Sequence, residues 1–270
     1  MPINVAIEII QKNDDAKDAR ELLLSLKTSK LSVLVVVFLS LIACTSKESN
    51  LIVKGNIEGL KKGTLYLQKI ENDSLINLDS VAIRGDANFE LRTNIESPQI
   101  MYLFLDKVDN ASYIERIEFF AEEGEVEINS TLKNFQIDAK VKGSANQEKL
   151  VEYKKMISRF NDSNLDLIQK NFEAQRDNNE EELVAINKEY DRLLARKYLY
   201  TVNFAINNKD LEIAPYLALS EVFDANIKYL DTIYNSMTPK VKESMYGAEL
   251  KDFLEERRNL EKLEARVEEQ

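Results

Sequence analysis

The spacing of apolar residues changes near Ser144, and this change constrains the fold more than any other feature of the chain. Before it, short segments alternate apolar and polar residues, whereas after it apolar residues recur every three or four positions. Six of the seven glycines lie between Gly55 and Gly143, where short strands need turns. Alternation is typical of half-buried strands and the longer period is typical of amphipathic helices. The pattern therefore predicts an α+β protein, with a β domain followed by an α-helical domain.

The β domain, residues 51–143, is predicted to contain eight strands separated by turns such as Arg84–Asp86. Many short strands at nearly regular spacing favour an antiparallel β-sandwich, with a partly open barrel as the alternative. Ile117 and Phe119 share one face of their strand, opposite Glu118, so we expect one buried face and one glutamate-rich, solvated face. The predicted strands are 51–59, 64–70, 75–83, 87–95, 99–106, 113–121, 124–132 and 135–143.

The helical domain, residues 144–270, is predicted to begin with a long antiparallel hairpin, because two apolar stripes flank the polar run Asp177–Glu182. Polar residues at 161–164 interrupt or end the first stripe. Shorter helices follow, one of which should begin at Thr238-Pro239, since Thr is a good N-cap and Pro suits the first helical position. The two long stripes consist of Leu150, Tyr153, Ile157 and Phe160, and of Leu183, Ile186, Tyr190, Leu193, Leu194, Tyr198 and Val202.

The only cysteine, Cys44, follows an apolar run from Leu31 to Ala43. This run is shorter than the roughly 20 residues that a spanning helix needs, and it has the length of a signal-peptide core. A small residue before a cysteine resembles the bacterial lipobox, in which the cysteine is lipidated and becomes the new N-terminus. We predict a signal peptide at 1–43, lipidation of Cys44 and a tether at 44–50. A buried core cysteine is the alternative.

Lipidation would attach the protein stably to a membrane, because two or more acyl chains suffice where one is marginal. We expect it in the bacterial cell envelope, on the periplasmic face of the outer membrane. Exposure at the cell surface stays open, because Thr45–Glu48 faintly resembles surface-export signals. The acidic residues between Asp14 and Glu21 are unusual before a signal peptide. A start codon assigned too far upstream explains them, with a working N-terminal helix as the alternative.

Composition excludes several classes of function. A net charge of −11 disfavours nucleic acid as a partner. The chain has no histidine, and lipidation of Cys44 would leave no thiol, which removes the usual nucleophilic triads, disulfides and zinc sites. No phosphate-binding or nucleophile-elbow motif occurs. We therefore expect no enzyme activity, no cofactor and no metal. A glycosidase needs only two carboxylates, but no feature of the sequence singles out such a pair.

Some motifs have both a functional and a structural interpretation. Arg84-Gly85-Asp86 is the tripeptide that integrins read, but it lies where a hairpin turn is expected. The run Asp177–Glu182 could bind calcium, but it lacks the glycine and spacing of an EF-hand loop, so a solvated helix start is favoured. The spacing of Gly55, Gly59 and Gly63 suggests a helix-packing motif, but their strand context favours turns.

Four aromatic residues of the helical domain could line a ligand groove: Tyr198, Tyr200, Phe204 and Tyr216. Aromatic residues at helical spacing more often belong to a core, so we expect core positions for them, with a functional patch as the alternative.

The β domain resembles a known family. The segments "VKGNIEGLKKGTLYLQ", "LDSVAIRGDANFEL", "FFAEEGEVEI" and "VKGSANQE" resemble, in order, the blocks of the domain of unknown function 4369, over residues 51–148. That domain occurs in envelope lipoproteins of Bacteroidota, often ahead of a thioredoxin-like domain, and has no known catalytic residues. The segment "IYNSMTPKVKESMYGAELKDFL" resembles the part that joins the two domains. This sequence stops at Gln270, where the thioredoxin-like domain would follow, so the resemblance implies no redox activity here.

These features together predict an envelope-anchored lipoprotein that acts as a non-catalytic binding or assembly module. Its expected partners are the membrane, through the lipid, and another envelope protein. The alternative is an accessory half of a thiol–disulfide interchange system whose thioredoxin-like domain is separate or lost. Its partner would then be a separate thioredoxin-like protein.

Overall fold

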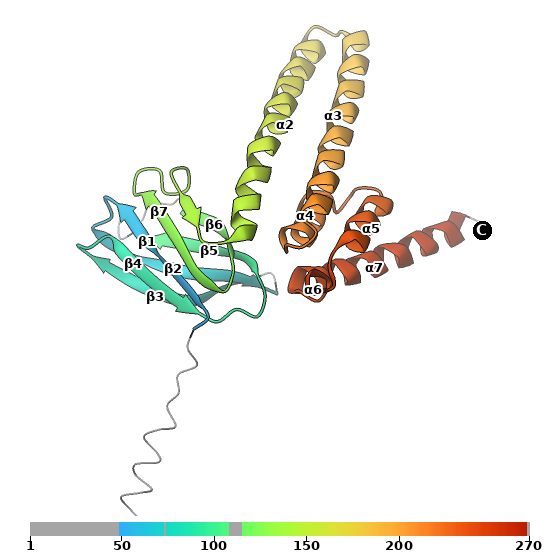
Figure 1. Ribbon diagram of the computed structural model, residues 1–270. Helices are drawn as coiled ribbons and strands as arrows, with labels where there is room; N and C mark the ends of the chain where they lie inside the picture. Colours follow the sequence, from blue (N-terminus) through green and yellow to red (C-terminus); the bar gives the residue numbers. More distant parts are fainter. Residues whose placement is uncertain (1–48, 73, 108–114, 269–270) are drawn as a thin grey trace, which may run out of the picture. The chain divides into compact units, whose positions relative to one another are not determined.

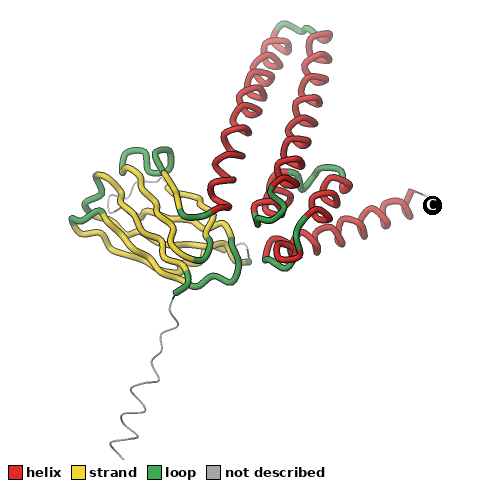
Figure 2. The backbone as a smooth tube through the Cα atoms, viewed as in Figure 1, coloured by secondary structure: helices red, strands yellow, loops and turns green. Residues whose placement is uncertain are grey.

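The structure is a computed structural model that describes residues 49–72, 74–107 and 115–268 (Figure 1). Residues Ser49–Gln270 form one compact unit. Within the described part, strands come first and helices follow (Figure 2), which confirms the predicted α+β class. Cys44 and the predicted signal peptide lie outside the described residues. The strands are β1 (Leu51–Glu58), β2 (Lys62–Glu71), β3 (Ser74–Arg84), β4 (Asn88–Thr93), β5 (Gln99–Asp106), β6 (Glu115–Ala121), β7 (Gly124–Thr131) and β8 (Lys140–Lys142).

The strands form two four-stranded sheets, so the sandwich interpretation is right and the partly open barrel is wrong. One sheet has the order β4-β1-β7-β8 and the other the order β3-β2-β5-β6. Side chains from both sheets meet in one core, as Val53 and Val126 from the first and Leu65 and Phe119 from the second illustrate. All four are fully buried. Burial of this apolar surface is the main force that holds the sheets together.

Five of the six strand pairs are antiparallel, and β1 and β7 pair in parallel. The antiparallel prediction therefore misses this one pair. Alternation of apolar residues specifies which face of a strand is buried, but it carries no information on the direction of the neighbouring strand.

The last predicted strand, 135–143, is wrong over its first half. Only Lys140–Lys142 form β8, and residues 133–138 form a turn. The Ser130 hydroxyl donates to the Phe135 carbonyl at 2.6 Å, and the Thr131 hydroxyl to the Asp138 carboxylate at 2.7 Å. These local hydrogen bonds compete with a strand, as short polar side chains commonly do.

The helices are α2 (Ala145–Arg176), α3 (Glu180–Asn207), α4 (Ile213–Glu221), α5 (Ile227–Ser236), α6 (Pro239–Lys242) and α7 (Met245–Glu268). Figure 1 shows α2 and α3 side by side as the predicted long hairpin. The polar residues 161–164 do not end α2. Three of them are exposed, and the Ser163 hydroxyl donates back to the Arg159 carbonyl, so they interrupt only the apolar stripe.

Helix starts follow local sequence signals. Asn179 accepts a hydrogen bond from the Glu182 backbone N–H, and three glutamates occupy the first turn of α3, which confirms the predicted helix start. Pro239 opens α6 as expected, although the Thr238 side chain makes no capping hydrogen bond. Among the described helices, none is both long enough and apolar enough to span a bilayer.

Candidate functional site

The strongest candidate for a site is the junction where β5 and β6 meet the helices. Ile100 and Phe120 lie on the outer face of their sheet, yet they are buried against Leu150, Tyr153 and Leu217 of the helices. The predicted solvated outer face is therefore wrong at this end of the sheet. A strand that is buried on both faces carries consecutive apolar residues, as Phe119 and Phe120 do.

Aromatic rings fill the junction. The Phe120 ring lies edge-on to Tyr216, with centroids 5.7 Å apart, and close to Tyr246 at 6.1 Å. Tyr153 of α2 packs against Phe204 of α3 at 5.3 Å. Edge-to-face pairs at these separations are favourable beyond the area they bury.

Side chains of the helical half satisfy main-chain groups of the sheet. The Phe120 N–H donates to the Gln147 side-chain oxygen at 2.7 Å, and the Ile100 N–H donates to the Tyr246 hydroxyl at 3.0 Å. Before α2, the Glu122 carboxylate accepts from the Ser144 hydroxyl at 2.6 Å. Buried main-chain groups need such partners, so these bonds fix the helices to β5 and β6.

A second set of buried polar contacts joins the start of α2 to the start of α4. Asn146, which is fully buried, donates from its amide to the Glu212 carboxylate at 2.8 Å. Its side-chain oxygen accepts from the Ile213 N–H at 2.7 Å. One asparagine thereby supplies partners to two buried groups of another helix.

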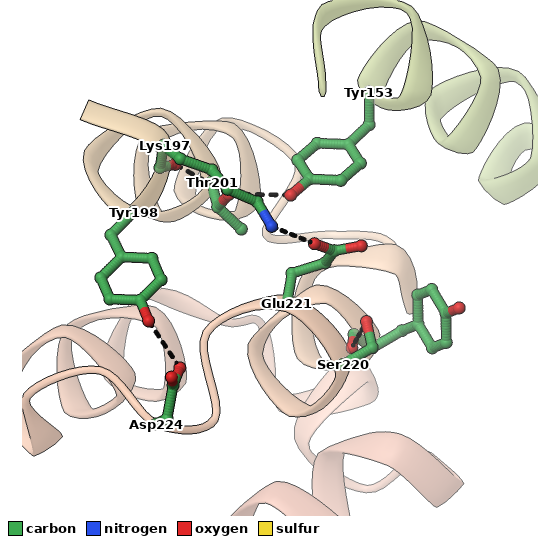
Figure 3. Close-up of polar contacts among 8 residues, drawn as sticks. Tyr153, Lys197, Tyr198, Thr201, Ser220, Glu221 and Asp224 are labelled. Atoms are coloured by element: carbon green, nitrogen blue, oxygen red, sulfur yellow. Dashed lines mark hydrogen bonds and ion pairs between the residues drawn. The ribbon is translucent and has the colours of Figure 1, made fainter. Parts of the chain in front are cut away.

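Figure 3 shows polar contacts among the helices. The Tyr153 hydroxyl points toward the Thr201 hydroxyl, at 2.8 Å, and Lys197 reaches across to the Glu221 carboxylate, at 3.0 Å. The Tyr198 hydroxyl donates to the Asp224 carboxylate at 2.7 Å. Together these contacts link α2, α3, α4 and the segment that follows α4.

The tyrosines of this region stay protonated near neutral pH. Burial raises the pKa of Tyr246 to about 12 and the pKa of Tyr153 further still. Burial, together with the hydrogen bond to Asp224, also raises the pKa of Tyr198 to about 12. A protonated phenol can donate and accept hydrogen bonds, but it is a poor base or nucleophile at neutral pH.

The four predicted aromatic residues do not form one groove. Tyr200, Phe204 and Tyr216 belong to the cluster against the sheet, whereas Tyr198 packs with the core of α3, α4, α5 and α7. This distribution confirms the core interpretation.

Other sequence motifs also have structural roles. Gly85 adopts a φ of +97° in the turn between β3 and β4, which confirms the turn interpretation of the Arg84–Asp86 tripeptide. The run Asp177–Glu182 lies at the turn between α2 and α3. Within the described ranges, no group of three or more Cys, Asp or Glu side chains is placed to hold a metal ion.

Sequence reasoning missed the junction residues Phe120, Gln147 and Tyr246. The one local signal for them is the Phe119-Phe120 pair, which a strand with a solvated face would not carry. The contact from Tyr246 to Ile100 spans 146 residues of sequence, so no local pattern predicts it.

In the comparison with known proteins, a match was found for the β half of the chain. No curated protein matches the chain. Residues 51–150, which span the sandwich and the first turns of α2, match the family described as "Domain of unknown function (DUF4369)", and this match confirms the family resemblance of the N-terminal half.

Proposed function

We propose that this chain is a bacterial envelope lipoprotein, anchored through lipid on Cys44, that acts as a non-catalytic binding or assembly module. The polar contacts of the junction are the main support for this proposal. The buried polar groups of the junction bond to one another and to main-chain atoms of the sheet, and the tyrosines there have raised pKa values. Such an arrangement favours a rigid scaffold over a reaction centre. The proposed module uses no cofactor or metal, and its net charge of −11 disfavours nucleic acid.

Exposed apolar side chains on the hairpin support a role in association. Leu165, Ile168 and Phe172 recur at helical spacing along α2 and are 63%, 43% and 66% exposed. Exposed apolar stripes on soluble domains commonly mark surfaces that other molecules cover.

A crosslinking experiment tests the proposed function. The tagged, lipidated chain is crosslinked in intact cells, and adducts are recovered from membranes. We expect a discrete adduct with an envelope protein, and we expect excess purified chain to displace that protein when the complex is reformed without crosslinker. The matched control carries the same residues 1–50 fused to an unrelated domain, so that it shares the anchor alone.

An adduct that forms equally with the control, or that the purified chain does not displace, would contradict a specific module. Recovery of a thioredoxin-like protein as the specific partner would instead favour the accessory role in thiol–disulfide interchange.

The anchor has a separate test. Replacement of Cys44 by alanine removes the only sulfur that could accept the lipid. We expect the Cys44→Ala chain to take up no labelled palmitate and to accumulate as an uncleaved precursor. Metabolic labelling and the mass of the purified protein measure both outcomes. Normal labelling of this variant would refute the lipoprotein assignment.

A further inference from the structure

A row of charges with alternating sign crosses the outer face of the sheet β4-β1-β7-β8. Lys54 of β1 lies opposite Glu90 on β4 and opposite Glu127 on β7, and Glu127 lies opposite Lys142 on β8. Opposite charges on directly facing strand residues stabilise a sheet. The row ends with the positive charge of Lys142 on β8, so an acidic side chain would be favoured at the next position beyond β8.

Strand β8 forms an edge of this sheet, because it pairs with β7 on one side and with no other strand in the described parts of the chain. At the opposite edge, the Arg92 N–H of β4 already donates to the Asp79 carboxylate at 2.7 Å. An edge strand presents unpaired N–H and C=O groups that another extended segment can use. One main-chain donor at the β4 edge is therefore already paired.

A groove of about 500 Å³ runs beside β8, between β6 and the first turns of α2. Ile117, Val141 and Val151 provide apolar lining, and Val151 is 53% exposed. Lys140, Lys142 and Lys154 are the basic residues among the lining side chains, which include one acidic residue, Glu118, bound to Lys154 at 2.7 Å. The groove is thus locally basic on a chain whose net charge is −11.

The two faces of β8 set the pattern that a partner should have. Val141 packs toward the core of the sandwich, whereas Lys140 and Lys142 follow the rows of Asn129 and Glu127 on the outer face. Side chains of an added strand would alternate in the same way. Every second residue would face the apolar lining, and the residues between them would face the two lysines.

We propose that β8 accepts an extended segment of a partner protein, which adds to this sheet as a fifth strand and carries alternating apolar and acidic residues. This inference rests on the proposed binding function and names a surface and a partner chemistry for it. Strand addition would supply main-chain hydrogen bonds for affinity and side-chain pairing for specificity. A second copy of β8 fits poorly, because its lysines would face Lys140 and Lys142.

Binding of a defined peptide to the purified full chain tests the proposal. The probe is acetyl-Thr-Glu-Val-Glu-Val-Glu-Thr-amide, measured by calorimetry or fluorescence anisotropy. We expect binding that weakens with salt and that falls about tenfold in the double variant Lys140→Glu/Lys142→Glu. The matched control is the double variant Lys61→Glu/Lys62→Glu, at two exposed lysines at the start of β2 on the other sheet. It makes the same change of charge and should leave binding unchanged. A peptide with lysines in place of its glutamates should bind the double variant better than it binds the native chain.

Strand addition also predicts that a probe N-methylated at alternate residues binds less well, because methylation removes main-chain donors. Absence of binding up to about 1 mM, equal binding by the double variant, or equal binding of the methylated probe would each overturn the proposal. The proposal would also be overturned if the double variant self-associates and the native chain does not bind the peptide. Lys140 and Lys142 would then serve to prevent edge-to-edge association of β8. If the peptide does not bind but a specific partner is still captured in cells, this binding surface is refuted and the proposed function is not.

Discussion

Replacement of Gly55 by alanine is expected to destabilise the protein by about 3–5 kcal/mol or to prevent folding. A Cβ atom at this position would lie 1.7 Å from the carbonyl oxygen of Ile128 and 2.6 Å from its carbonyl carbon. Both atoms belong to the main chain of β7, the parallel neighbour of β1, so no side-chain rotation can relieve the overlap. The two central strands of the sheet would have to separate. Urea unfolding, followed by far-UV circular dichroism, measures the loss.

The control is Gly85→Ala, in the turn between β3 and β4. Nothing lies within 4 Å of a Cβ atom there, but the φ of +97° disfavours any other residue. The free energy of unfolding of this variant should fall by about 1–2 kcal/mol, from backbone strain alone. If Gly55→Ala lowers the free energy of unfolding no more than Gly85→Ala does, the close approach of β1 and β7 does not constrain the fold.

Gly55 also illustrates what the sequence could not predict. The strand context of Gly55, Gly59 and Gly63 favoured turns. This prediction holds for Gly59, which has the positive φ of a turn residue, but not for Gly55 and Gly63, which lie within β1 and β2. The reason for glycine at position 55 is different: a strand 73 residues away in sequence passes too close for a side chain. Local pattern predicts turns, because the turn requirement is local. It does not predict the approach of a distant strand.

The same distinction between local features and long-range contacts applies to the candidate site. The stripes of α2 and α3 were predictable because burial along a helix follows a fixed period, although Tyr190 of the predicted α3 stripe is 46% exposed. The role of Tyr153 as a core residue followed from that period. Its hydroxyl partner, Thr201, did not, because the pairing depends on how two helices rotate against each other. The basic groove beside β8 likewise depends on strand order, which alternation does not specify.

Asn146 should be the most sensitive polar residue of the junction. Its side chain satisfies both the Glu212 carboxylate and the Ile213 N–H, and neither Asn146 nor Glu212 is more than 4% exposed. Replacement by leucine keeps the branched shape of the side chain but leaves a buried carboxylate and a buried main-chain donor without these partners. Removing one partner of a buried charge strongly destabilises a protein, so we expect Asn146→Leu to cost about 3–5 kcal/mol. Equilibrium unfolding in urea measures this cost.

A double-mutant cycle separates the hydrogen bond from simple misfit of leucine. Glu212→Gln keeps an acceptor for the Asn146 amide and should cost less than about 1 kcal/mol, because one neutral hydrogen bond replaces a charge-assisted one. The Glu212→Leu variant has no carboxylate at this position that could lose its hydrogen-bond partner. Asn146→Leu should then cost at least about 1–2 kcal/mol less than in the native chain. Equal costs in the two backgrounds would mean that the side-chain contact between the starts of α2 and α4 contributes nothing to stability. The junction would then be held by its aromatic packing and by its other hydrogen bonds, such as the one from the Phe120 N–H to Gln147, since neither depends on Asn146.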